Sequence, residues 1–355
     1  MRLLIKILLG LLVTTSCFAD KNLGLPPLTI PTDNPQTAEK IKLGQLLFND
    51  KRLSADGLVS CASCHRSDTA FTDGLPISKG IKQQLGTRNA PTVINSAYYE
   101  TQFLDGRESS LEAQAKGPLV NPVEHGFSHI ELVVDVVNQD AAYREQFQQA
   151  FNVKPDDITI EHIAKAIASF ERTLIAGDSP FDRYYFGKDQ SALSDSAARG
   201  SRIFRRKGNC MTCHEISWNN ALFTDNRFYN VGVGFERLKP VLAELTSAIN
   251  QQQAVNISEL TDAQRSELGR FAVTRIPADL GRFKTPTLRN VALTAPYMHD
   301  GSLKTLEEVI EHYDKGGISN AYIDPKIFPL HLTVQEKADL AAFLKSLTSA
   351  ESELN

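Results

Sequence analysis

The sequence lacks the features that indicate a membrane-spanning or nucleic-acid-binding protein. Its longest apolar run, from Ile7 to Val13, is shorter than the roughly 18 apolar residues that cross a bilayer. The formal net charge is −4, without a strongly acidic or basic tail, so nucleic acid is not expected as a partner. No segment alternates apolar and polar residues as a half-buried strand does. These absences favour a helical, globular protein without a membrane span.

The N-terminus has the layout of a secretory signal peptide. Arg2 and Lys6 flank the apolar run, and the small-residue stretch "TTSCFA" follows it. We predict a leader at residues 1–19, cleaved after about Ala19, and a periplasmic protein. A lipoprotein signal acylated at Cys17 is the alternative, which is disfavoured because Thr14 stands where such signals usually have Leu. Cleavage would leave 336 residues, enough for two domains, and a formal net charge of about −6.

Cysteine is scarce, and every cysteine beyond the leader belongs to one of two short motifs. "CASCH" contains Cys61, Cys64 and His65, and "CMTCH" contains Cys210, Cys213 and His214. Four cysteines in an exported chain could form two disulfides or one zinc site. A His directly after the second Cys, in both copies, favours attachment of haem c instead, with two thioether bonds and an imidazole ligand to iron. We therefore predict two covalently bound haem c groups.

The two motifs belong to an apparent internal repeat. "APTVINSAYYETQFLDGRESSLEAQ" from Ala90 aligns without gaps on "TPTLRNVALTAPYMHDGSLKTLEEV" from Thr285, at an offset of 195 residues. The predicted fold is all-α, with two cytochrome c-like haem domains related by internal duplication. Their predicted bounds are 20–190 and 191–355, with the join near 186–195.

Helical periodicity is clearest in two segments. Apolar residues recur at helical spacing between Ile158 and Leu174, and again between Val334 and Leu347. Thr333 is the predicted N-cap of the second helix, because Glu336 follows three residues later. The polar stretch 238–270 has no counterpart in the first half, and we expect it to be an insertion on the surface.

The two halves differ where an iron ligand could lie. At the same offset, Pro118 of the first half corresponds to Tyr313 of the second. Proline cannot bind iron, whereas a Tyr phenolate can. We therefore expect an open N-terminal haem and a six-coordinate C-terminal haem. Met298 is an alternative sixth ligand, but its counterpart Phe103 suggests a packing position, so Tyr313 is favoured.

An open haem iron could bind hydrogen peroxide. Cleavage of the O–O bond then needs a group that takes a proton from one oxygen and returns it to the other. Only the first half offers distinctive candidates after the repeated block, in "QAKGPLVNPVEHG": Gln114, Glu124 and His125. Glu124 is the preferred acid–base group, since an apolar pocket could tune its carboxylate. His125 either tunes that carboxylate or faces solvent.

Together these motifs resemble the bacterial di-haem cytochrome c peroxidase and MauG-like family, from about Asn34 to Leu347. The matching stretches include "RNAPTVIN", "NPVE" and "FKTPTLRNVALTAPYMHDGSLKTLEE". The resemblance implies that His65 and His214 are proximal iron ligands, and that Glu124 is the distal acid–base group assisted by Gln114. It also implies a calcium ion between the haems, a hard cation held by oxygen atoms. The implied calcium ligands are Asn89 and the carbonyls of Thr294 and Pro296.

Three positions depart from the peroxidase branch of that family. Ile81, in "SKGIK", stands where this branch has a His that caps the active haem, and Tyr313 stands where it has Met. Both departures resemble the MauG-like branch. Leu104, in "FLDGR", replaces the family Trp that lies between the haems. The only Trp of the chain, Trp218, is expected to pack.

The resulting prediction is a di-haem c-type peroxidase. Hydrogen peroxide would be reduced at the His65 haem, and a small cytochrome or cupredoxin would supply electrons through the C-terminal haem. The alternatives are a MauG-like enzyme that oxidises a side chain of a partner protein, and a non-catalytic di-haem electron carrier. A homodimer is left open. His299 and Asp300 are expected to be structural, and no role is assigned to the remaining histidines, namely His129, His162, His312 and His331.

Overall fold

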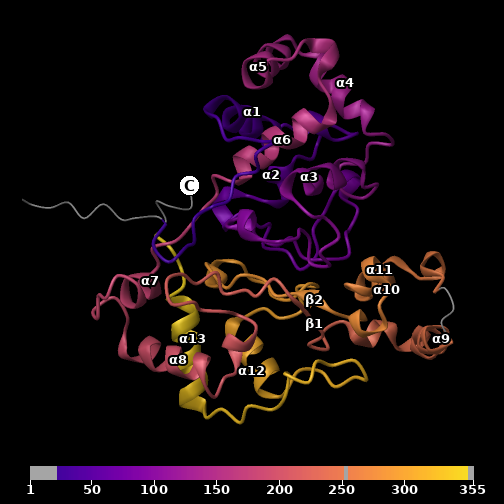
Figure 1. Ribbon diagram of the computed structural model, residues 1–355. Coiled ribbons are helices and arrows are strands. Elements are labelled where there is room, and N and C mark those ends of the chain that lie inside the picture. Colours follow the sequence, from indigo (N-terminus) through magenta and orange to yellow (C-terminus); the bar gives the residue numbers. More distant parts are fainter. Residues whose placement is uncertain (1–21, 252–254, 351–355) are drawn as a thin grey trace, which may run out of the picture.

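The computed structural model describes residues 22–251 and 255–350, which fold into two mostly helical lobes (Figure 1). The predicted leader, with Cys17 and Ala19, lies outside the described residues. Within the described ranges, no helix is both long and apolar enough to cross a membrane. The indigo and magenta lobe of Figure 1 holds the first cysteine motif, and the lobe drawn in rose, orange and yellow holds the second.

The N-terminal lobe is built from six helices. They are α1 (Ala38–Asn49), α2 (Cys61–Cys64), α3 (Leu111–Val120), α4 (Glu131–Gln139), α5 (Ala141–Phe151) and α6 (Ile160–Glu171). Helix α6 packs against α1 and α3, and one continuous apolar core lies between them. Leu43, Leu47 and Ile163 are fully buried in this core. The helix predicted from Ile158 to Leu174 is therefore confirmed as α6, a few residues shorter.

The C-terminal lobe repeats this arrangement. It contains α8 (Asp195–Arg205), α12 (Leu306–Asp314) and α13 (Val334–Lys345), and α13 packs against α8 and α12. Thr333 caps α13 as predicted, because its hydroxyl accepts from the Glu336 backbone N–H while the Glu336 carboxylate accepts from the Thr333 N–H. The linking helix α7 (Pro180–Tyr185) places Phe181 in the core of this lobe, although Phe181 precedes the predicted join.

The crossing of the first and last helices is the same in both lobes. A Cβ added to Gly44 of α1 would lie 1.9 Å from the carbonyl oxygen of Ala166 in α6. A Cβ added to Gly200 of α8 would likewise lie 1.9 Å from the carbonyl oxygen of Asp339 in α13. Each glycine thus lets two helix backbones approach more closely than any side chain would allow.

The stretch expected to be a surface insertion has its own small core. Helices α9 (Lys239–Asn250), α10 (Asp262–Glu267) and α11 (Phe271–Thr274) surround a third apolar cluster, which includes Leu238, Leu268 and Leu280. The antiparallel pair β1 (Phe228–Tyr229) and β2 (Phe283–Lys284) joins this unit to the lobe. The surface prediction was therefore incomplete, because the segment also buries Glu267.

Residues 101–107 of the N-terminal lobe are held by the C-terminal lobe. The Lys284 backbone N–H donates to the Leu104 carbonyl at 2.8 Å, and the Lys284 ammonium donates to the Thr101 carbonyl. The guanidinium of Arg270 donates to the carbonyls of Asp105 and Gly106 at 3.0 and 2.6 Å. These contacts fix the place where the two lobes meet.

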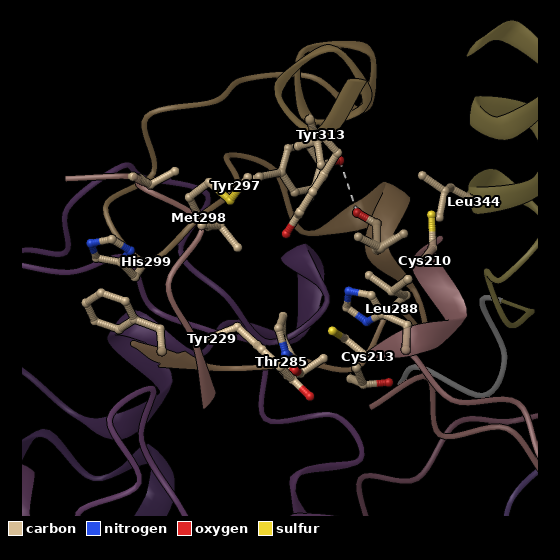
Figure 2. A pocket seen from close by; sticks show the side chains of 18 of the residues that line it. Cys210, Cys213, Tyr229, Thr285, Leu288, Tyr297, Met298, His299, Tyr313 and Leu344 are labelled. Carbon is tan, nitrogen blue, oxygen red and sulfur yellow. Dashed lines mark hydrogen bonds between the residues drawn. The ribbon is translucent and has the colours of Figure 1, made fainter. Parts of the chain in front are cut away.

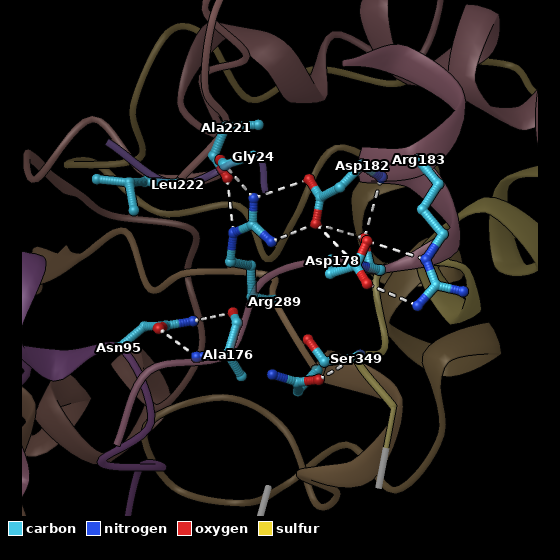
Figure 3. Close-up of polar contacts among 12 residues, drawn as sticks. Gly24, Asn95, Ala176, Asp178, Asp182, Arg183, Ala221, Leu222, Arg289 and Ser349 are labelled. Atoms are coloured by element: carbon cyan, nitrogen blue, oxygen red, sulfur yellow. Dashed lines mark hydrogen bonds and ion pairs between the residues drawn. The ribbon is translucent and has the colours of Figure 1, made fainter. Parts of the chain in front are cut away.

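A buried ion pair ties the start of the described chain to the C-terminal lobe (Figure 3). Arg289 and Asp182 have side chains that are 1% and 0% exposed, and two hydrogen bonds of 2.8 and 2.9 Å join them. Arg289 also donates to the carbonyls of Gly24 and Ala221. This one guanidinium therefore gathers three separate segments.

Candidate haem sites

The histidine of each motif is held in the orientation that a metal ligand needs. Nδ1 of His65 lies 3.2 Å from the Phe71 carbonyl oxygen, and Nδ1 of His214 lies 2.8 Å from the Phe223 carbonyl oxygen. Because a carbonyl oxygen can only accept, Nδ1 carries the proton in both rings. The Nε2 lone pair is then free to bind a metal.

The cysteines of the two motifs are free thiols. Cys61 and Cys64 bound the short helix α2, whereas Cys210 begins a 3₁₀ turn that ends at Thr212. No cluster of three or more His, Cys, Asp or Glu side chains that could hold a metal occurs among the residues that the structure describes. The four described cysteines therefore form neither the disulfides nor the zinc site considered as alternatives.

A cavity of about 280 Å³ adjoins the second motif. Cys210, Cys213 and His214 line it, together with apolar side chains such as Leu288 and Leu344. Two thiols, an imidazole with a free nitrogen and apolar walls are the groups that a covalently bound haem requires. The residues at this site therefore fit a haem.

Both candidate sixth ligands line the same cavity. Tyr313 extends into the cavity from α12. In Figure 2 it lies on the opposite side of the picture from Cys213, and Met298 lies nearby on the connecting loop. Burial, followed by the nearby Cys213 and Cys210 thiols, raises the pKa of Tyr313. The neighbouring His312 is not among the residues that line the cavity.

Near the first motif, Glu124 is a largely buried carboxyl with one neutral partner. The amide Nδ2 of Asn121 donates to Glu124 Oε1 at 2.7 Å. Burial raises the pKa of Glu124, and the guanidinium of Arg107 opposes that shift. Gln114 and Pro118 lie one turn apart on α3, so they share one face of that helix.

His125 and Ile81 hold the turn that contains Glu124 through hydrogen bonds and packing. His125 is 4% exposed, and its Nδ1 lies 2.6 Å from the Leu53 carbonyl oxygen, so it does not face solvent. The Ile81 N–H donates to the Glu124 carbonyl at 3.0 Å, and a Cβ added to Gly126 would lie 2.1 Å from Ile81 Cδ1. Ile81 therefore acts through packing, and its side chain cannot bind iron.

The three residues suggested as calcium ligands all line the cavity: Asn89, Thr294 and Pro296. The Asn89 backbone N–H donates to the His299 carbonyl at 2.8 Å, and its amide Nδ2 donates to the Leu75 carbonyl at 2.6 Å. Among the described residues nothing donates to the Asn89 amide oxygen, which is the atom that a hard cation would use.

His299 has the structural role expected from the sequence. Its Nε2 lies 2.7 Å from Glu267 Oε2, and its ring stacks on Phe283 with centroids 3.7 Å apart. Arg237 pairs with both Glu267 and Asp300. Glu267 could not be identified from the aligned halves, because it lies in α10, which has no equivalent in the first half.

The position of the tryptophan was predicted wrongly. Trp218 is 86% exposed rather than packed. It lies in a short surface loop closed by a hydrogen bond from the Ser217 N–H to the Asn220 carbonyl. Leu104 lines the cavity together with Tyr99. A leucine and a tyrosine therefore lie where the lobes meet.

A tyrosine–aspartate pair beside the second motif was also missed. The Tyr229 hydroxyl donates to Asp225 Oδ2 at 2.6 Å, and Lys326 Nζ donates to the Tyr229 oxygen at 3.1 Å. Burial, and then the hydrogen bond to Asp225, raise the pKa of Tyr229. The repeated "FTD" at 71–73 and 223–225, after each cysteine motif, was the signal that could have pointed to Asp225.

Comparison with protein families gives two adjacent matches. A family model described as di-haem cytochrome c peroxidase matches residues 38–190, and one described as cytochrome c matches residues 197–348.

Individual relatives match most of the chain. Cytochrome-c peroxidase IdrP1 of Pseudomonas sp. (strain SCT) is 38% identical over 335 residues, which cover 92% of this chain and 85% of that protein. Methylamine utilization protein MauG of Methylorubrum extorquens is 37% identical over 317 residues, which cover 89% and 80% respectively. The crystal structure of a MauG-like protein associated with microbial copper homeostasis is similar with a TM-score of 0.76 at 35% identity, and the match covers 94% of this chain and 95% of that one.

Proposed function

Because the chain belongs to the bacterial di-haem cytochrome c peroxidase family, we propose that it reduces hydrogen peroxide at the N-terminal haem site and relays electrons there through the C-terminal one. The proposal is supported by the different side chains at the two sites. The buried carboxyl of Glu124 and the non-ligating Pro118 belong to the first half, whereas Tyr313 enters the cavity of the second.

Two haem c groups would be held by the two motifs. Cys61, Cys64 and His65 would hold the first, and Cys210, Cys213 and His214, with Tyr313, the second. Bound haem supplies an iron that binds peroxide and exchanges electrons. The protein supplies the remaining chemistry.

Glu124 would handle the proton. Its carboxylate would take a proton from one peroxide oxygen and return it to the other, which would leave as water. The Asn121 amide holds one carboxylate oxygen in place. Gln114, on the same helix face as Pro118, assists by orienting the peroxide. Because burial raises the pKa of Glu124, the basic form is less populated at acidic pH, and the rate should rise with pH.

Three further properties belong to this proposal. The protein is exported to the periplasm after cleavage near Ala19. Calcium is held by Asn89, Thr294 and Pro296, a set of oxygen ligands that suits a hard cation. The electron donor is a small cytochrome or copper protein.

The MauG-like alternative is favoured by Tyr313 and by the similarity to MauG. In that case a side chain of a partner protein, rather than a small redox protein, supplies the electrons. If the protein catalyses the oxidation of a reduced cytochrome by hydrogen peroxide over many turnovers, the peroxidase function is favoured over the MauG-like one.

The Glu124→Gln variant tests the proposal directly. We expect unchanged haem content and a peroxide reaction slowed by about 10²–10⁴-fold, since that is the usual contribution of general acid–base catalysis. Stopped-flow absorbance of the haem-loaded protein measures this rate. Glu161→Gln, at an exposed carboxylate of α6, is the matched control and should react like the unmodified protein. Equal rates in both variants would remove Glu124 from the mechanism, and no reaction in the unmodified protein would favour the non-catalytic carrier.

A further inference from the structure

Tyr229, Asp225 and Lys326 form a compact group at the edge of the cavity. Tyr229 and Cys213 both line the cavity (Figure 2). A haem attached through Cys213 would therefore have the phenol of Tyr229 in the same cavity. None of these three residues has a role predicted from the sequence.

The hydrogen bond to Asp225 provides a proton acceptor. The phenol donates to Asp225 Oδ2 at 2.6 Å, and Asp225 Oδ1 accepts from the Arg227 backbone N–H at 2.9 Å. That second bond fixes the carboxylate in a tight turn, so Oδ2 stays aimed at the phenol. A short hydrogen bond to an ionised acceptor is the arrangement in which a phenolic proton moves most easily.

Lys326 restricts how Tyr229 can lose an electron. Its ammonium lies 4.8 Å from the centre of the Tyr229 ring and donates to the phenol oxygen at 3.1 Å. A positive charge at this distance opposes a second positive charge on the ring. Oxidation therefore has to be accompanied by loss of the phenolic proton, which gives a neutral radical.

We propose that Tyr229 is a redox-active residue, which gives one electron to the C-terminal haem while its phenolic proton moves to Asp225. This inference rests on the proposed peroxidase function, because hydrogen peroxide is the oxidant. The phenolic O–H bond breaks, and a new O–H bond forms at Asp225 Oδ2. The products are a neutral tyrosyl radical and a neutral carboxylic acid.

The cycle closes with an electron from outside. Peroxide takes two electrons as it is reduced to water, and Tyr229 supplies one of them for a short time. A reduced small redox protein then returns one electron to the radical, and Asp225 returns the proton. Tyr229 is partly exposed, so such a donor can approach it.

The first half of the molecule lacks this group. The offset of 152 residues that aligns the two "FTD" stretches places Ile77 opposite Tyr229. Isoleucine can neither donate a proton nor lose an electron at an accessible potential. The redox-active tyrosine is therefore proposed only for the C-terminal site, where electrons are expected to enter.

Electron paramagnetic resonance of the haem-loaded protein, frozen after one equivalent of hydrogen peroxide, tests the proposal. We expect an organic-radical signal that narrows when the protein contains ring-deuterated tyrosine. Tyr229→Phe should reduce that signal to background. Asp225→Asn keeps an oxygen for the Arg227 turn but removes the proton acceptor, so the radical should form more slowly.

Tyr143→Phe is the matched control. Tyr143 also donates to an aspartate, Asp50, at 2.7 Å, and Arg52 lies 5.4 Å from its ring, but Tyr143 does not line the cavity. This variant should keep the full radical signal. Haem content, measured by absorbance, must be the same in all variants that are compared.

The outcomes separate the two proposals. An undiminished radical in Tyr229→Phe, or no radical in a protein that consumes peroxide, overturns the role of Tyr229 and leaves the peroxidase function intact. A protein that consumes no peroxide overturns the peroxidase function, and the role of Tyr229 with it.

Discussion

The two lobes share a scaffold and differ in what surrounds the predicted haem. In each lobe two helices cross at a glycine, a Phe ring lies near the motif histidine, and a carbonyl oxygen fixes Nδ1 of that histidine. The ring centroids are 6.4 Å apart for Phe48 and His65, and 6.5 Å apart for Phe204 and His214. The proximal side is thus built the same way twice.

The differences lie in the helix and loops that follow. Helix α3 carries Pro118 and leads to Glu124, whereas α12 carries Tyr313. In the sequence, Tyr229 likewise aligns with Ile77 at the offset of the two "FTD" stretches. Similar helices in the two lobes therefore carry different side chains at the positions to which we assign different roles.

The largest expected effect concerns the fully buried ion pair between Arg289 and Asp182, whose arginine has no charged counterpart in the first half. Ile94 is the counterpart of Arg289 in the repeat. Arg289→Met should destabilise the protein by about 3–5 kcal/mol, because Asp182 would remain buried without its partner. Urea unfolding measures this loss.

Lys345→Met provides the control for that variant. Lys345 pairs with Glu307 on the surface, where the two side chains are 59% and 61% exposed. Its loss should cost at most about 1 kcal/mol. Equal effects of the two substitutions would show that burial does not strengthen the dependence of Asp182 on its partner.

The next prediction concerns the crossing that both halves share. Gly44→Ala and Gly200→Ala should each destabilise the protein by about 1–3 kcal/mol, because the added methyl group forces two helices apart. Gly86→Ala, where the nearest atom would be 3.6 Å away, should have little effect. Strongly unequal losses at Gly44 and Gly200 in thermal unfolding would mean that the lobes are packed less alike than their geometry indicates.

The smallest effect concerns the caps of the two last helices. In α6 the Thr159 N–H donates to His162 Nδ1, and in α13 the corresponding acceptor is Glu336. Burial, and then Lys165, hold the pKa of His162 below its ordinary value of 6.5. The unfolded chain therefore binds the proton first, and this contribution to stability is lost as the pH falls below 6.5.

His162→Gln tests that difference. Glutamine can still accept the N-cap hydrogen bond but does not titrate. Below pH 6.5 the unmodified protein should lose about 0.5–1 kcal/mol of unfolding free energy, and the variant should not. Unfolding free energies measured on either side of that pH give the comparison. Glu336→Gln should leave the pH dependence of stability in that range unchanged, because the hydrogen bond from Lys207 holds the pKa of Glu336 below 4.5. An equal change in both variants would contradict the assignment.

Covalent motifs and periodic helices could be predicted from the sequence. The apolar stripes located α6 and α13. The C-x-x-C-H spacing led to His214, and the alignment of Tyr313 with Pro118 led to Tyr313; both side chains line the cavity. These features depend on residues close together in the chain or on the repeat itself.

Contacts without a counterpart in the repeat could not be predicted. Glu267 reaches His299 from a segment found in only one half, and Lys326 reaches Tyr229 from 97 residues further along the chain. Trp218 was misplaced because a large apolar side chain is normally buried, whereas here the loop geometry keeps it at the surface.

The hydrogen bond from Arg289 to the Gly24 carbonyl has a consequence for synthesis of the chain. Its two ends are 265 residues apart, so the ribosome makes Gly24 long before its partner exists. Contacts of such high contact order form late. The N-terminal lobe has its own core helices, whereas the C-terminal lobe needs its last helices and also the turn at Gly24, near the start of the described chain. A fragment starting at residue 191 would lack both Gly24 and Asp182, and with them two of the partners of Arg289.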